Sequence, residues 1–203
     1  MYIDGFNLYY GCLRHSPWKW LDPVAMCRKL LPRHHLSQIR YFTSMISARL
    51  DDPSAPQRQS TYLRALRTLP MVSVHLGQFT THVRRLPLAS SPPGSPQYVD
   101  VHRTDEKGTD VNIATHLLVD GYENKYECAV LITNDSDLLE PVRVVRQKLG
   151  KIVGIINPHV RASKQLRSEA TFMKQIRTGV LESSQFPPVM SDVHGIITKP
   201  SAW

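Results

Sequence analysis

Two nearly uninterrupted apolar runs limit the folds that this chain can adopt. The runs are CAVLIT at 128–133 and KIVGII at 151–156, and the segment between them, DLLEPVRVVRQKLG at 137–150, has the apolar spacing of a helix. Strands that are apolar at almost every position are buried on both faces, as parallel strands are when helices cover them. This order of strand, helix and strand predicts a parallel sheet with helices packed against it.

The same alternation of strands and helices runs through most of the chain. Further strands are predicted at 1–3, 39–43 and 72–79, and further helices at 6–14, 24–31, 58–69, 110–124 and 164–176. The helix at 24–31 has Asp22 as its cap and Pro23 at its first position, which is a favourable start. Together these elements predict an α/β protein with three layers.

Two segments depart from this alternation. RRLPLASSPPGSPQ at 84–97 is rich in Pro, Ser and Gly, which predicts a flexible insertion near 84–100, with QYVDVH at 97–102 as a candidate short strand on its far side. The stretch at 179–203 is expected to be an irregular C-terminal tail. We therefore expect one domain over 1–178, followed by this tail.

The charge balance favours an anionic partner. Lys and Arg number 25 against 17 Asp and Glu among 203 residues, so the net charge is +8, and nucleic acid is the commonest polyanion for a basic protein. No apolar run approaches the roughly 20 residues of a membrane-spanning helix. The N-terminus has Asp4 and lacks the basic region of a signal peptide, so we expect a cytoplasmic protein without membrane contact. The three cysteines show no CxxC spacing, which argues against a disulfide framework or a zinc site.

Acidic residues concentrate where the predicted strands end. Asp4 directly follows the first strand, Asp135 and Asp137 follow the run at 128–133, and Asp110 opens its helix. Ligand sites of open parallel sheets lie beyond the carboxyl ends of the strands, so these four carboxylates are expected to converge. Each also has a purely structural explanation, because Asp favours turns and helix starts.

Converging carboxylates repel one another and need a compensating charge. A divalent cation supplies it, and ligands that are all oxygen favour Mg²⁺ or Mn²⁺ over zinc. Such a cation binds phosphate oxygens and activates water, while surrounding Lys and Arg residues hold a polyanion. The pattern therefore indicates an enzyme that cleaves phosphodiester bonds.

Three stretches resemble the motifs of the NYN domain, a family of the PIN-like ribonuclease group whose bacterial branch includes LabA-like proteins. They are YIDGFNLYYG at 2–11, EKGTDVNIATHLL at 106–118 and VLITNDSDLLEPV at 130–142, and the resemblance spans about residues 1–178 in the family's order. It implies a Rossmann-like α/β/α fold with a mainly parallel sheet. It also implies a metal-dependent endoribonuclease.

The resemblance further implies roles for individual residues. Asp4, Asp110 and Asp135 would bind Mg²⁺ or Mn²⁺, and Asp137 would supply a further carboxylate to the metal. Asn7 would hold Asp4 or a metal-bound water. These five residues are the predicted catalytic residues.

Charged residues near the motifs are candidates for binding the substrate. Lys107 precedes Asp110 by three positions, and Arg161 and Lys164 lie in the loop that follows the second apolar run. We expect these basic residues to contact the phosphates of single-stranded RNA, although a solvated charged surface is the commoner explanation. Glu106 is a weaker candidate for the carboxylate group.

Aromatic residues near the first motif have two explanations. Tyr9, Tyr10, Trp18 and Trp20 follow the IDGFN stretch closely, and aromatic side chains near a basic cleft stack on single-stranded bases. They also fill cores, and for Trp18 and Trp20 we favour core packing.

Two other functions are compatible with the sequence. A protein of this fold could act as an RNA-binding or regulatory module that cleaves RNA weakly. A phosphatase or phosphotransferase with Asp4 as the nucleophile would need an acid at position 6, which is Phe. A homodimer is an open alternative to a monomer, because small domains of this kind often expose apolar helix faces.

Overall fold

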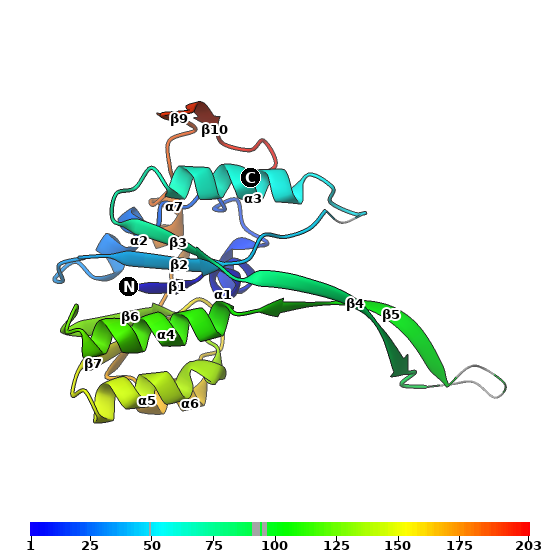
Figure 1. The fold of residues 1–203 in the computed structure, drawn as a ribbon. Helices are drawn as coiled ribbons and strands as arrows, with labels where there is room; N and C mark the ends of the chain where they lie inside the picture. Colours follow the sequence, from blue (N-terminus) through cyan, green and yellow to red (C-terminus); the bar gives the residue numbers. More distant parts are fainter. Residues whose placement is uncertain (49, 91–93, 95–96) are drawn as a thin grey trace.

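The computed structural model has a six-stranded sheet at its centre (Figure 1), and it describes every residue except 49, 91–93, 95 and 96. The strands lie in the order β3-β2-β1-β6-β7-β8, and every neighbouring pair is parallel. Their bounds are β1 (Tyr2–Asp4), β2 (Ile39–Thr43), β3 (Val72–Leu76), β6 (Cys128–Ile132), β7 (Ile152–Asn157) and β8 (Phe172–Gln175). The predicted parallel sheet is confirmed. The strand order reverses between β1 and β6, and ligands of such sheets bind at the carboxyl ends of the two strands at this point.

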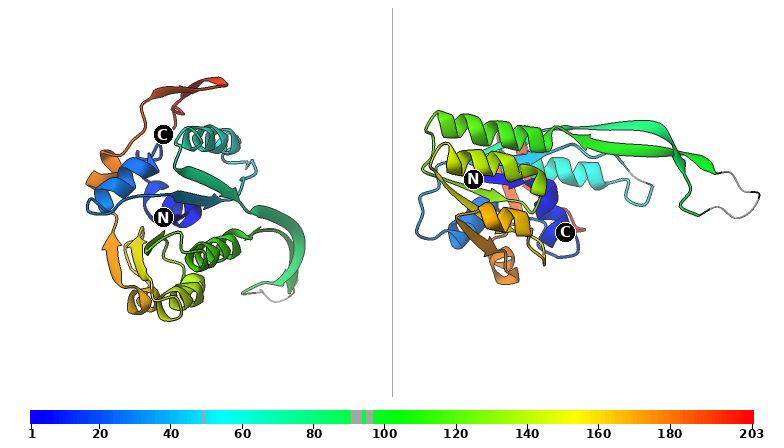
Figure 2. Two further views of the ribbon diagram at one scale, coloured as in Figure 1. Left: turned by 60° about the vertical axis from the view of Figure 1, so that its left-hand side comes forward. Right: turned by 90° about the horizontal axis from the view of Figure 1, so that it is seen from below.

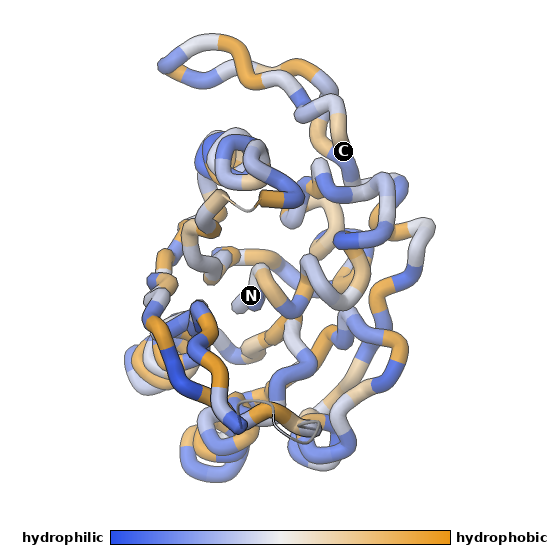
Figure 3. The backbone as a smooth tube through the Cα atoms, turned by 90° about the vertical axis from the view of Figure 1, so that its right-hand side faces the viewer, coloured by the Kyte–Doolittle hydropathy of each residue, from blue (hydrophilic) through white to orange (hydrophobic). Residues whose placement is uncertain are grey.

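Helices cover both faces of the sheet, which gives the three layers that we predicted (Figure 2). One layer contains α4 (Thr109–Tyr122), α5 (Leu139–Gln147) and α6 (Lys164–Glu169). The other contains α1 (Gly5–Leu8), α2 (Pro23–Leu30), α3 (Ala55–Leu66) and α7 (Thr178–Glu182). Hydrophobic and hydrophilic residues alternate along the helices, as expected of helices that cover a sheet with one face (Figure 3). Among the described residues, no helix combines the length and the apolar character needed to cross a membrane.

The central strand β6 shows why its sequence is apolar throughout. Val130 and Ile132 belong to the hydrophobic core on the side of α1–α3, whereas Ala129 and Leu131 belong to the core on the side of α4–α6. Successive residues of a strand point to opposite faces, so a strand between two helical layers has no face for polar side chains.

The end of the domain differs from the expectation of one long helix at 164–176. The helix α6 stops at Glu169, and the next residues form the edge strand β8, in which Phe172 pairs with Gly154. A Cβ atom added to Gly154 would lie 2.1 Å from the ring of Phe172. The missing side chain of this glycine therefore makes room for the ring, and this long-range packing outweighs the local helical pattern.

The segment near 84–100 is strand only at its two ends, which confirms the candidate strand at 97–102. The strands β4 (Gln78–Pro87) and β5 (Tyr98–Lys107) form an antiparallel hairpin, which we call the arm, and it projects from the body of the molecule (Figure 1). A hydrogen bond of 2.8 Å between the hydroxyls of Thr81 and Thr104 joins the two strands. The Pro- and Ser-rich residues 88–97 lie between the two strands in the sequence, and parts of the expected flexible stretch, at 91–93 and 95–96, lie outside the described residues.

The tail at 179–203 is likewise more regular than expected. It contains the hairpin of β9 (Val189–Asp192) and β10 (Gly195–Thr198), and the ring of Trp203 packs against Trp20 and Tyr62. Trp20 itself is fully buried, so the favoured core role of this residue is confirmed. Aromatic packing onto the core thus orders a tail that has little local periodicity.

Candidate active site at the carboxyl ends of the strands

Asp4 lies at the end of β1, and its side chain is buried, with 4% of the residue exposed. Its Oδ1 accepts a hydrogen bond from the backbone N–H of Asn7 at 2.9 Å, and its Oδ2 accepts from Nδ2 of Asn7 at 2.9 Å and from Oγ1 of Thr133 at 3.2 Å. Burial raises the pKa of Asp4, these hydrogen bonds lower it in part, and the charge of Asp135 raises it. The described groups that donate hydrogen bonds to this buried carboxylate are all neutral.

Asn7 connects three parts of this edge. Its Nδ2 donates to Asp4, and its Oδ1 accepts from the backbone N–H of Asn134 at 3.0 Å and lies 3.0 Å from Nε2 of His159. An amide oxygen only accepts hydrogen bonds, so Nε2 of His159 must carry a proton in this contact. The backbone N–H of His159 donates to Oδ1 of the buried Asn157. Asn7 thus lies beside Asp4 as expected, while His159 was not among the predicted site residues.

Asp135 and Asp137 occupy the loop after β6. The N–H of Asp135 donates to Oγ1 of Thr133 at 3.1 Å, and Oδ1 of Asp135 accepts from the N–H of Asp137 at 3.0 Å. Asp135 therefore caps the short 3₁₀ turn η2 (Ser136–Leu138), which agrees with the structural explanation for its presence. Asp135 is half-buried, and Asp137 is exposed at the periphery of the site.

Asp110 lies in the first turn of α4, and its carboxyl group is surrounded by like charges. Burial contributes most to raising the pKa of Asp110 to about 6, and the charges of Asp4, Asp135, Glu106 and Asp137 follow in that order. Interactions between charges in salt solution fade over about 10 Å, so this mutual influence requires the carboxylates to share one edge of the sheet. The charges of the other three predicted aspartates therefore reach Asp110 at this edge of the sheet.

Glu106 is held at the same edge by hydroxyl groups. Its Oε1 accepts a hydrogen bond from Oγ of Ser44 at 2.6 Å and another from Oγ1 of Thr109. A Cβ atom on the neighbouring Gly77 would lie 2.6 Å from both Oε1 of Glu106 and Oγ of Ser44, so a glycine is needed there. In the sequence, the only sign that Glu106 belongs to the site was its position directly before the KGTD stretch.

The four aspartates lack cationic partners among the described residues. No ion pair among the described residues involves Asp4, Asp110, Asp135 or Asp137. Equally, the part of the chain that the structure describes has no group of three or more His, Cys, Asp or Glu side chains ready to hold a metal ion. Mg²⁺ is commonly held by only one or two protein carboxylates and keeps several waters. The carboxylate and amide oxygens at this edge are donors of the type that Mg²⁺ prefers.

The predicted substrate-binding residues lie around this edge and are exposed. Lys107 ends β5 at the base of the arm, and Lys164 begins α6. Arg161 lies in the loop after β7, where its carbonyl oxygen accepts a hydrogen bond from Nδ2 of Asn134 at 3.1 Å. The N–H of Ser163 donates to Oδ1 of the same asparagine at 2.6 Å. The loop that contains Arg161 therefore borders the loop that contains Asp135.

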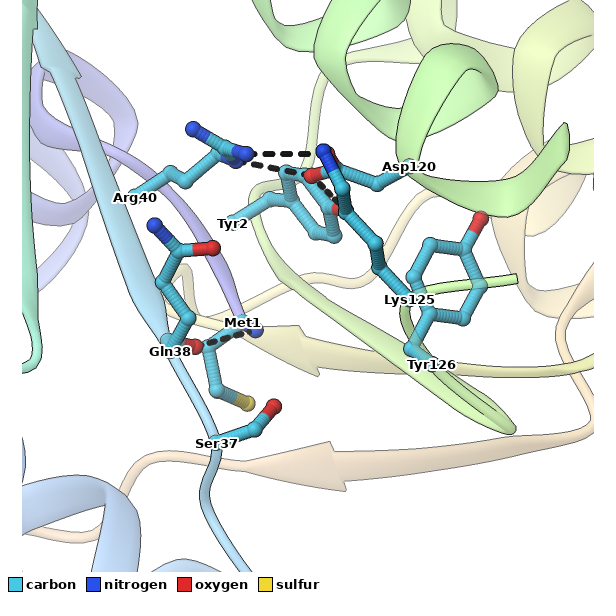
Figure 4. Close-up of a pocket in the computed structure, with 8 residues that line it drawn as sticks. All are labelled: Met1, Tyr2, Ser37, Gln38, Arg40, Asp120, Lys125 and Tyr126. Carbon is cyan, nitrogen blue, oxygen red and sulfur yellow. Dashed lines mark hydrogen bonds and ion pairs between the residues drawn. The ribbon is translucent and has the colours of Figure 1, made fainter. Parts of the chain in front are cut away.

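A small cavity lies at the opposite edge, beside the amino ends of β1 and β2, and Asp120 is one of the residues that line it (Figure 4). Nε and Nη2 of Arg40 donate to the two carboxylate oxygens of Asp120 at 2.7 and 2.8 Å, and the hydroxyl of Tyr2 donates to Asp120 at 2.8 Å. Nζ of Lys125 is 3.7 Å from the same carboxylate. This acid has the cationic partners that the four aspartates lack.

A parallel α/β/α sheet with acidic residues at its carboxyl edge agrees with a PIN-like fold. The family model of the NYN domain matches residues 1–177. The chain belongs to the NYN domain family, which confirms the resemblance of the three sequence motifs and the predicted fold class.

Two individual proteins are similar to this chain. One is named 6-hydroxy-3-succinoylpyridine 3-monooxygenase HspA and comes from Pseudomonas putida (strain DSM 28022 / S16). It is 29% identical over 237 residues, and the match covers 100% of this chain and 74% of the relative. The other is a crystal structure of a protein of unknown function from Vibrio parahaemolyticus RIMD 2210633. It has a TM-score of 0.54 and 17% identity, over 87% of this chain and 91% of that chain. At this identity the second comparison shows a similar fold alone.

Proposed function

We propose that this protein is a metal-dependent endoribonuclease that hydrolyses phosphodiester bonds of single-stranded RNA. The observation that carries the proposal is a set of aspartates at one edge of the sheet that repel one another and have no cationic partner among the described residues. Uncompensated carboxylates in a low-dielectric site favour binding of a cation. Membership of the NYN family, with its nuclease-type fold, supports the same reaction class.

Mg²⁺ or Mn²⁺ would be held by Asp4, Asp110 and Asp135, with Asp137 contributing from the periphery. When bound, such an ion lowers the pKa of a water molecule and stabilises negative charge on the phosphate. Asn7 would keep the Asp4 carboxylate in place through the two hydrogen bonds that it donates. Partners of this kind orient a ligand before the metal arrives.

The positive charge of the protein would supply the affinity for RNA. Lys107, Arg161 and Lys164 are exposed around the carboxylates and would contact phosphates on either side of the cleaved bond. The carboxylates would otherwise repel the phosphates of the substrate. Contacts with these three basic residues and the net charge of +8 would offset this repulsion.

A cleavage assay on an unstructured RNA oligomer tests this function. We expect cleavage by the wild-type protein with Mg²⁺ or Mn²⁺, none with EDTA, and none by Asp4→Asn with either metal. Asp192→Asn is a matched control, because this aspartate lies in the tail hairpin, outside the site, and forms an ion pair with Arg64 of α3. It should cleave as the wild type does. Cleavage that persists in EDTA, or in Asp4→Asn with saturating metal, contradicts the proposal.

A second candidate is an RNA-binding or regulatory module with weak or no cleavage. The absence of a ready-made group of three metal ligands among the described residues favours this alternative. The same assay, combined with a binding measurement, separates the two functions. Tight RNA binding without metal-dependent cleavage supports the module.

The name of the curated relative suggests a third reaction, the oxygenation of a hydroxypyridine. A monooxygenase consumes O₂ and a two-electron reductant, whereas hydrolysis of RNA requires neither. Incubation with 6-hydroxy-3-succinoylpyridine, a reduced nicotinamide cofactor and O₂ therefore tests it directly. Oxygen uptake that depends on the pyridine, with no RNA cleavage, would replace the ribonuclease proposal.

A further inference from the structure

Three aromatic side chains form a continuous row beside the carboxylates. We call Phe6, Tyr10 and Phe79 the aromatic row. The rings of Phe6 and Tyr10 are stacked with centroids 6.4 Å apart, and Phe79 meets Phe6 edge-on at 5.6 Å. The guanidinium of Arg14 lies over the ring of Tyr10, 5.5 Å from its centroid. The row thus ends in a cation that is itself exposed.

The row begins inside the candidate active site. Phe6 lies between Asp4 and Asn7 in the sequence, on the helix that Asp4 caps. Phe79 lies at the base of the arm and pairs across its strands with Glu106, whose charge acts on Asp110. Phe6 therefore lies near Asp4 and Phe79 lies across from Glu106, and Tyr10 continues the row one helical turn after Phe6.

The exposure of Tyr10 distinguishes the row from core packing. Tyr10 is 53% exposed, whereas the core aromatics Trp20 and Tyr62 are 0% and 6% exposed. Tyr10 follows directly on Tyr9, at the start of the π-helical turn η1 (Tyr9–Leu13), and such turns occur frequently at functional sites. An aromatic ring that is left open to water next to a site is available for stacking on a flat ligand.

We propose that the aromatic row is a stacking platform for an unpaired base of single-stranded RNA, next to the phosphate held at the carboxylates. The inference rests on the proposed function and names the feature of the substrate that this site recognises. Arg14 provides a positive charge at the outer end, where the RNA backbone would pass. Every base has a flat aromatic face, so such a platform accepts unpaired RNA without selecting a sequence, and base-paired RNA would be excluded.

The test is a binding measurement in a background that keeps the RNA intact. We choose full-length protein with Asp135→Asn and Mg²⁺, a fluorescently labelled uridine oligomer, and the same oligomer with its bases removed. Tyr10→Leu keeps an apolar side chain but removes the ring, and Tyr10→Phe keeps the ring. Stacking contributes about 1–3 kcal/mol per base, so we expect Tyr10→Leu to weaken binding of the uridine oligomer by about 5- to 150-fold. Tyr10→Phe should bind as the background protein does.

Two controls make the result specific. Tyr122 is 65% exposed at the far end of α4, and Tyr122→Leu should leave binding unchanged. The oligomer without bases should bind equally to the Tyr10 and Tyr10→Leu proteins. Equal binding of the uridine oligomer to these two proteins overturns the inference and leaves the ribonuclease proposal standing. Equal weakening with both oligomers also overturns it, and a wild-type protein that neither binds nor cleaves RNA overturns both proposals.

Discussion

The helix α4 carries an aspartate near each end, and the two have opposite surroundings. Asp110 and Asp120 are ten residues apart, or about 15 Å along a helix. Asp120 is buried but accepts hydrogen bonds from Arg40 and Tyr2 and lies near Lys125. The charges that act most strongly on Asp110 are those of other carboxylates.

The pKa values record this difference. Burial alone would raise the pKa of Asp120, but the hydrogen bonds from Arg40 and Tyr2 outweigh it and hold the pKa below its usual range. Burial and like charges together raise the pKa of Asp110 to about 6. A compensated acid stabilises the fold, whereas an uncompensated acid lowers stability and keeps its charge available for a ligand. The comparison therefore separates a compensated carboxylate from an uncompensated one on the same helix.

The largest effect is expected from removing the cation beside Asp120. The side chains of Arg40 and Asp120 are 13% and 5% exposed, so Arg40→Met leaves a buried carboxylate without its main partner. We expect a loss of about 3 kcal/mol in the free energy of unfolding, measured with urea. Arg40→Met/Asp120→Asn should regain most of it, because the second change removes the unpaired charge. A loss below about 1 kcal/mol in the single variant would mean that this pair contributes no more than an exposed one.

A smaller effect is expected at the carboxyl edge, where neutral groups hold Asp4. His159→Phe keeps a ring but removes the donor to Asn7, and Asn7 in turn donates to Asp4. Removing such an outer partner costs about 10- to 100-fold in metal affinity, so we expect this loss for Mn²⁺ in titration calorimetry. His159→Gln retains an N–H donor and should recover part of the affinity. Unchanged Mn²⁺ affinity in His159→Phe would show that this contact does not support the site.

The smallest effect is a gain in stability when the charge of Asp110 is removed. The pKa of Asp110 rises from its usual 3.8 to about 6 in the folded protein, so stability is lost as the pH rises through this range. Asp110→Asn lacks this loss. We expect it to be more stable at neutral pH by about 1 kcal/mol, a value reduced for the partly exposed side chain.

This gain should shrink as the pH falls towards 4, where Asp110 of the wild type becomes protonated. Urea unfolding in EDTA at several pH values measures it without bound metal. A variant that is less stable than the wild type at neutral pH would contradict the assignment of Asp110 as an uncompensated acid.

Local patterns were sufficient to predict much of the fold. The runs at 128–133 and 151–156 are apolar because both faces of these strands are buried, and this holds wherever a strand lies between two helical layers. Asp4 ends β1 and Asp135 lies in the loop after β6, so the topology of a parallel sheet places them at one edge. These predictions depend only on residues close together in the chain.

Predictions failed where a distant partner decides the local structure. Phe172 continues a helical pattern, yet it forms a strand because Gly154 leaves space beside it. His159 contacts the site through the side chain of Asn7, which is 152 positions away in the sequence. No local pattern in the sequence predicted this contact.

The amino-acid order alone thus determined the class of fold and the edge at which acidic groups gather, because alternation and strand ends are local properties of a chain. Only the tertiary structure decided which acids remain without a countercharge. Arg40 and Asp120 are 80 positions apart and meet through the packing of α4 on β2, while the same packing brings Asp110 towards Asp4 and Asp135. Charge balance depends on distances between side chains in space, and a sequence does not contain them directly.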